Sequence, residues 1–224
     1  MRATFARRTQ APRTVHSWWG KAWQRAVEEA AYSEAELRPG RAAARRGDVG
    51  GISVDSGSLL AAVRDGDDAW TVEVVVPTLE PDMAQALVEV VAAESGRIAD
   101  LLAGALPHDL VEHAEELGVE LLPYGGELAA TCTCEHYLDP CAHAIAVLTQ
   151  VGWLVDDDPL VLFAVRGLDR EDLLAALHAR AAGHGRSAGP VVGELADDVE
   201  LAVDAALRAR RIADLFEAGA DFEA

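Results

Sequence analysis

The sequence predicts an α+β protein, with an N-terminal helix and an antiparallel β-meander, a helical middle, a β-hairpin–helix unit and C-terminal helices. Three observations lead to this class. Apolar residues recur at helical spacing near both ends of the chain. Between residues 49 and 76 short β-branched runs alternate with Gly- and Asp-containing breaks. All three cysteines fall within ten residues, and half of the 224 residues are hydrophobic, enough to form a core.

Charge is distributed unevenly along the chain. Residues 1–46 hold ten basic and four acidic groups, which gives them a net charge of +6. The rest of the chain has a net charge of −25, so the whole chain has a net charge of −19. We therefore expect a polyanion to be attracted only to the N-terminal end. The nucleic-acid-binding candidates in this basic region are Arg7, Arg8, Arg13, Lys21, Arg41, Arg45 and Arg46.

Composition also narrows the compartment and the origin. Apolar runs are short and interrupted by charge, which excludes a membrane span, and the basic N-terminus lacks a following apolar segment typical of a secretory signal. Free cysteines at this spacing fit a reducing cytoplasm. A high share of arginine over lysine, with many alanines, indicates a GC-rich bacterial genome.

The first region, residues 1–78, combines a basic arm, a tryptophan-rich helix and the meander. Ser17 is a suitable N-cap for a helix ending near Ala31, in which Trp19 and Trp23 lie on one buried face. The meander is expected to have three or four strands. Its candidate strands are residues 41–46, 49–54, 59–64 and 70–76.

The second region, residues 79–182, is mainly helical. Pro81, Pro107 and Asp169 mark expected helix starts, and Gly118 an expected helix end. The predicted helices span residues 82–94, 98–106, 107–117, 141–155, 160–165 and 170–182. A flexible linker at 183–190 and an acidic amphipathic helix over 191–216, within the last region 191–224, complete the chain.

Residues 119–155 form the expected hairpin–helix unit. Strands 119–122 and 127–134 are predicted to pair around the Tyr124-Gly125-Gly126 turn. Asp139 and Pro140 then resemble the N-cap and first residue of a helix. The cysteine stretch thus lies where a strand gives way to a helix.

The cysteine stretch has the composition of a metal site. Residues two apart on a strand face the same side, so Cys132 and Cys134 present both sulfurs together. Cys141 and His143 follow in the first helical turn. Thiolates and imidazole are preferred zinc ligands, and four of them close a structural tetrahedron with no open position. We therefore predict one structural Zn²⁺ on Cys132, Cys134, Cys141 and His143.

Two rival interpretations concern the same stretch. His136 is an alternative fourth ligand, although it follows Cys134 by only two residues. A thiol hydrolase or redox enzyme using Cys141 as nucleophile is the second, but a nucleophile needs no further cysteines beside it. Zinc that resists exchange, with no reactive thiol before chelation, would count against this enzyme.

The pattern Cys132-x-Cys134-x6-Cys141-x-His143 resembles the SWIM zinc finger. The flanking segments Trp18-Trp19-Gly20-Lys21-Ala22-Trp23, Arg41-x3-Arg45-Arg46-Gly47 and Asp158-Pro159-Leu160-x-Leu162-Phe163-x3-Arg166-Gly167 are similar to those of bacterial, mainly actinobacterial, proteins of this family. The resemblance implies zinc on the same four residues. It also implies binding of DNA or proteins and an accessory role beside a SWI2/SNF2-type helicase-like ATPase.

These observations together predict a non-catalytic, zinc-binding interaction module. The acidic loop from Glu135 to Asp139 favours a protein partner over direct DNA contact by the finger itself. Direct nucleic-acid binding through the basic N-terminal region is the main alternative, and it predicts an affinity that falls steeply with salt.

Overall fold

The fold is that of a computed structural model, which describes residues 2–12, 14–31 and 33–187. The chain divides into two compact units, Met1–Leu177 and His178–Ala224. The first unit contains the sheet and the helices that surround it. Arg13 and the predicted helix 191–216 lie outside the described residues.

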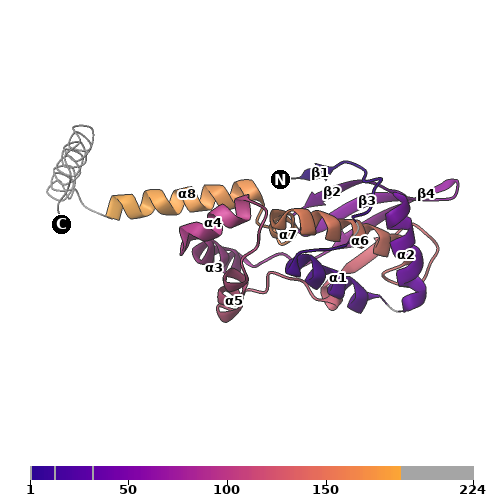
Figure 1. The fold of residues 1–224 in the computed structure, drawn as a ribbon, viewed down its shortest axis with the longest axis horizontal. Helices are drawn as coiled ribbons and strands as arrows, with labels where there is room; N and C mark the ends of the chain where they lie inside the picture. Colours follow the sequence, from indigo (N-terminus) through magenta and orange to yellow (C-terminus); the bar gives the residue numbers. More distant parts are fainter. Residues whose placement is uncertain (1, 13, 32, 188–224) are drawn as a thin grey trace, which may run out of the picture. The chain divides into compact units, whose positions relative to one another are not determined.

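One antiparallel sheet runs through the first unit in the order β1-β2-β3-β4-β5 (Figure 1). Its strands are β1 (Ala3–Phe5), β2 (Val49–Asp55), β3 (Ser58–Asp65), β4 (Asp68–Val75) and β5 (Ala129–Cys132). Alternate side chains such as Leu59, Val63 and Val72 are fully buried, as expected for a sheet with one face on the core. The predicted meander is therefore present as β2, β3 and β4.

Eight α-helices accompany the sheet within the described residues. They are α1 (Trp18–Ala30), α2 (Glu34–Arg46), α3 (Pro81–Ala92), α4 (Ser95–Leu102), α5 (His108–Glu116), α6 (Ala142–Asp157), α7 (Pro159–Val165) and α8 (Arg170–Ser187). This mixture of helices and an antiparallel sheet confirms the predicted α+β class.

Helix α6 is the centre of the first unit. It contacts β2, β3, β4 and β5 as well as α1 and α2, and it is buried on almost every side. The α1 indoles of Trp19 and Trp23 donate hydrogen bonds to the α6 carbonyls of Val155 (2.8 Å) and Leu148 (3.0 Å). A Cβ at Gly152 would lie 2.8 Å from the Trp23 ring, so glycine permits this close approach.

The cap of α1 connects it to the end of α6. The Ser17 hydroxyl accepts a hydrogen bond from the Gly20 amide (2.9 Å) and donates one to Asp156 (2.6 Å). The amides of His16 and Ser17 also donate to the Asp156 carboxylate. Ser17 is thus the N-cap predicted from the sequence.

Residues 41–46 form the last turns of α2, so their assignment to a strand is wrong. Alanine and arginine are strong helix formers, and Gly47 ends the helix with a φ of 73°. Pro39 stands inside the helix and obscures its continuity in the sequence. Gly40 lets α2 approach α6, because a Cβ there would lie 2.6 Å from Ile145.

The predicted hairpin of residues 119–122 with 127–134 is also wrong. Residues 119–122 form no strand, and β5 pairs with β4, with Val74 opposite Ala130. Val119 and Leu121 are buried, and the Glu120 carbonyl accepts a hydrogen bond from the Arg166 guanidinium (2.6 Å). Packing and this arginine therefore take the place of strand pairing.

Two terminal segments differ from expectation. The basic arm contributes strand β1, which pairs with β2 through Ala3 and Val54. The Asp169 carboxylate accepts hydrogen bonds from the amides of Glu171 and Asp172 at the start of α8, as predicted for a cap. That helix continues through Ser187 into the predicted linker.

Candidate metal centre

The four predicted ligands are brought together by the end of β5, the turn after it and the start of α6. Cys132 is the last residue of β5, and pairing with β4 continues through hydrogen bonds between Thr133 and Thr71 (3.0 and 2.9 Å). Cys141 is the N-cap of α6, and His143 is in its first turn. A strand and a helix that are both anchored in the core therefore position the centre.

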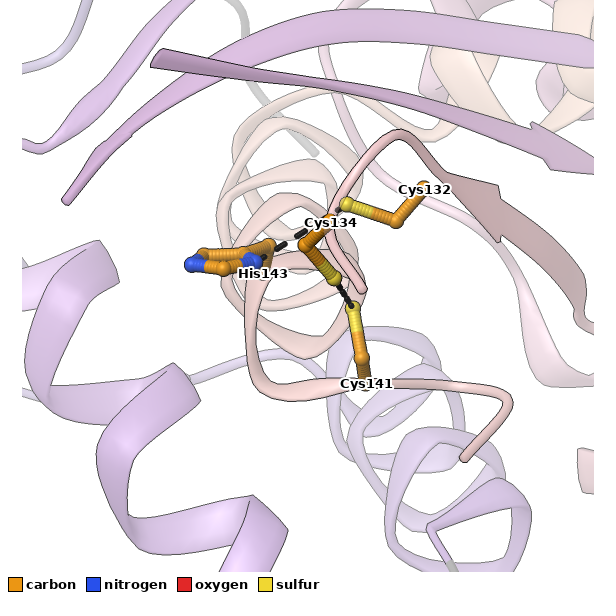
Figure 2. A group of neighbouring side chains, drawn as sticks. All are labelled: Cys132, Cys134, Cys141 and His143. Atoms are coloured by element: carbon orange, nitrogen blue, oxygen red, sulfur yellow. Dashed lines mark hydrogen bonds between the residues drawn. The ribbon is translucent and has the colours of Figure 1, made fainter. Parts of the chain in front are cut away.

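The ligand atoms form a compact group (Figure 2). All four lie within 4.8 Å of one another, with 3.7 Å between the sulfurs of Cys134 and Cys141. His143 Nδ1 is 3.8 Å from the Cys132 sulfur. Two sulfurs bound tetrahedrally to one zinc ion at about 2.3 Å would be about 3.8 Å apart. The cluster fits one structural Zn²⁺.

Asp65, at the end of β3, orients the histidine. Its carboxylate oxygen is 3.3 Å from His143 Nε2, while Nδ1 of the same ring faces the thiols. A carboxylate on the second ring nitrogen fixes the tautomer and orientation of a metal-binding histidine. The Trp70 ring lies beside the imidazole, with centroids 6.1 Å apart. Sequence reasoning recognised Asp65 only as a turn residue.

The thiols differ in acidity when no ion is bound. Burial raises the pKa of Cys132 to about 12 and also raises the pKa of Cys141. For Cys134, burial opposes ionisation, but hydrogen bonds from the His136 amide and the neighbouring side chains lower the pKa to about 7. Binding of zinc would displace the remaining thiol protons and stabilise the folded arrangement.

The loop between Cys134 and Cys141 contains His136, the rival ligand, and Asp139, the predicted helix cap. His136 is outside the ligand group; its Nε2 is 3.7 Å from a Glu36 carboxylate oxygen, and its ring stacks on Tyr137. The predicted cap at Asp139 is wrong, since Cys141 holds that position. The Asp139 carboxylate instead accepts a hydrogen bond from the Ala130 amide of β5 (3.0 Å).

The structure places the basic candidates in different surroundings. Arg7 donates to the Gly47 carbonyl (2.8 Å), Arg8 pairs with Asp157, and Arg46 pairs with Asp48 (2.8 Å). One groove is lined by three other candidates, Lys21, Arg41 and Arg45.

Comparison with known proteins identifies the segment around the cluster. The family model of the SWIM zinc finger matches residues 117–152, which include all four candidate ligands. The chain is 31% identical over 168 residues to uncharacterized protein Rv2102 of Mycobacterium tuberculosis. That alignment covers 74% of this chain and 60% of the relative. No solved structure matches the chain. In the described part of the chain, no helix is long and apolar enough to cross a membrane.

Proposed function

We propose that this chain, which carries a SWIM zinc finger, is a non-catalytic module that binds a protein partner, a bacterial SWI2/SNF2-type helicase-like ATPase. Four protein ligands around one ion leave no position for a substrate or an activated water. Cys141 is 4% exposed and its pKa is raised, which opposes a nucleophilic role. Binding therefore explains the centre better than catalysis.

The observation that supports this proposal is the exposed aromatic pair on the loop of residues 135–140, which we call the finger loop. Tyr137 is 90% exposed, and its ring stacks on His136 with centroids 5.3 Å apart. A tyrosine held in this way is suited to anchor a protein interface. Glu135 and Asp139 beside it are exposed acids and favour a basic surface on the partner.

The metal centre prepares this loop for binding. Cys134 precedes the exposed residues and Cys141 follows them, so one ion would fix both ends of the loop. The hydrogen bond from the Ala130 amide to Asp139 attaches the loop to β5 as well. A loop fixed before the partner arrives loses less conformational entropy on binding.

The test uses the zinc-loaded full chain and a purified SWI2/SNF2-type ATPase encoded in the same genome. Tyr137→Ala is expected to weaken binding by tenfold or more, measured by biolayer interferometry with nuclease-treated proteins. Tyr124→Ala is the matched control, because Tyr124 is 57% exposed but lies outside the finger loop. It is expected to change the affinity less than twofold.

Two results would overturn the proposal. One is the absence of binding to the ATPase at micromolar concentrations with zinc loaded. The other is binding that is insensitive both to Tyr137→Ala and to removal of zinc by a chelator. Loss of binding after nuclease treatment would instead support a nucleic-acid bridge.

Nucleic-acid binding through the N-terminal region is the second candidate. The observation in its favour is that Lys21, Arg41 and Arg45 line one groove. Arg7, Arg8 and Arg46 do not line this groove, so they support it less. We expect nucleic-acid binding to be lost as the salt concentration rises and to be lost in Lys21→Ala.

A further inference from the structure

A groove between α1, α2 and α6 has a size and lining that suit a small anionic ligand. Its volume is about 430 Å³, within the usual range for small-molecule sites. We call it the basic groove. The lining side chains that matter here are Lys21, Gln24, Arg41, Arg45, Thr149 and Trp153.

The three cations reach the basic groove from two walls. Lys21 belongs to α1, whereas Arg41 and Arg45 are one turn apart on α2 and therefore neighbours on its surface. Lys21 and Arg45 are exposed, and neither side chain has a hydrogen bond or ion pair within the described residues. Their charges are available to a ligand.

Arg41 is half-buried and already pairs with Glu28. A guanidinium has five N–H donors, so it can bind a second anion while keeping this partner. The pairing also holds the Arg41 side chain in place before a ligand arrives. Among the residues that the structure describes, the groove thus combines one paired cation with two unpaired ones.

Much of the remaining lining of the groove is apolar, although Gln24 and Thr149 are polar. Val15, Val27 and Leu148 contribute aliphatic surface, and Trp153 lies in the wall at 7% exposure. Cations that converge from two walls suit one compact, multiply charged group better than carboxylates spaced along a peptide. The apolar wall suits a flat, poorly hydrated group attached to it.

We propose that the basic groove binds a nucleotide unit. The phosphate lies between Lys21, Arg41 and Arg45, and the nucleoside rests against the apolar wall. A free nucleotide and a nucleotide within a single strand share this chemistry. The proposal does not depend on what the zinc finger binds. It deepens the second candidate function, nucleic-acid binding, only if the bound nucleotide belongs to a single-stranded nucleic acid.

The experiment measures binding of three probes to the zinc-loaded full chain: inorganic phosphate, AMP and a fluorescein-labelled dT10 strand. Tryptophan fluorescence follows phosphate and AMP, because Trp23 and Trp153 line the groove. Anisotropy follows the strand at two salt concentrations. AMP is expected to bind more tightly than phosphate, and the Lys21→Ala/Arg45→Ala double variant to bind AMP at least tenfold more weakly.

Arg25→Ala is the matched control. Arg25 is an exposed cation on the same helix as Lys21, but it does not line the groove, so AMP binding should change less than twofold. Melting curves of each variant verify that it is folded. Tight AMP binding with no strand binding would support the groove and reject the second candidate function.

Three results would overturn the nucleotide proposal. The first is no binding of AMP or dT10 at millimolar concentration by folded protein. The second is binding that survives the double variant unchanged. The third is an acidic decapeptide that binds more tightly than AMP and depends on Lys21 and Arg45, which would assign the groove to a protein segment.

Discussion

The two ends of helix α6 are stabilised in different ways. At its start, Cys141 and His143 belong to the cluster of four candidate metal ligands, and the loop that precedes Cys141 is largely exposed. Farther along, Trp23 and Trp19 of α1 pack against the helix and donate to the carbonyls of Leu148, near its middle, and Val155, near its end. We therefore expect dependence on the metal at the start of α6, where the ligands lie, and not where the tryptophans pack.

Loss of one metal ligand should have the largest effect. Cys132→Ser is expected to abolish stoichiometric zinc binding, whose apparent free energy in structural sites is about 10–16 kcal/mol. Hydrogen exchange should rise in residues 129–143 and remain slow near Trp153. Metal analysis and exchange mass spectrometry measure both effects. Thr131→Ser is the control, and unchanged zinc content in Cys132→Ser would contradict the prediction.

Truncation of a tryptophan that packs on α6 should lower the stability of the fold and leave zinc binding unchanged. Trp23 is fully buried, so Trp23→Ala is expected to cost about 3–5 kcal/mol of the free energy of unfolding. Urea denaturation measures this cost. Zinc affinity of the folded variant should be unchanged within twofold. If the folded variant loses zinc, the two ends are coupled and the comparison fails.

Removal of the histidine's partner should weaken zinc binding without unfolding either end. Asp65→Ala is expected to lower zinc affinity by about 10- to 100-fold, because the His143 ring loses the carboxylate that orients it. Competition with a chromophoric chelator measures the affinity. Asp67→Ala, in the same turn, should match wild type. Equal affinities in both variants would exclude a role for Asp65.

Removal of the cap of α1 should have the smallest effect. Ser17→Ala deletes the acceptor for the Gly20 amide and the donor to Asp156, and is expected to cost about 1 kcal/mol. Thermal melting detects this change, while zinc affinity stays constant. Ser17→Thr, which keeps the hydroxyl, should restore most of the stability. A loss in Ser17→Thr as large as in Ser17→Ala would show that the hydroxyl is not responsible.

The comparison also explains what the sequence predicts well. The four ligand positions lie within twelve residues, and Ser17 caps the helix that follows it, so both are local signals. Asp65 is 78 positions from His143, and the packing of α6 against the sheet brings the two elements together. A turn aspartate carries no local mark of such a role.

Errors in the predicted elements have a similar cause. Val119 and Leu121 are separated by one polar residue, as in a short strand, yet the backbone carbonyl of that residue, Glu120, is bound by a distant arginine. Pro39 and Gly40 suggest a loop, although contact with α6 makes them part of a helix. In both cases tertiary contacts outweigh local preference.

The contact of Asp139 with Ala130 has a consequence for solubility. Strand β5 is at the edge of the sheet, and the Asp139 carboxylate occupies one of its outward amides. Because the loop that carries Asp139 is held by the metal ligands, loss of the ion would uncover this edge. Open strand edges recruit further strands from other molecules. Zinc depletion should therefore lead first to self-association, before the core of the fold is lost.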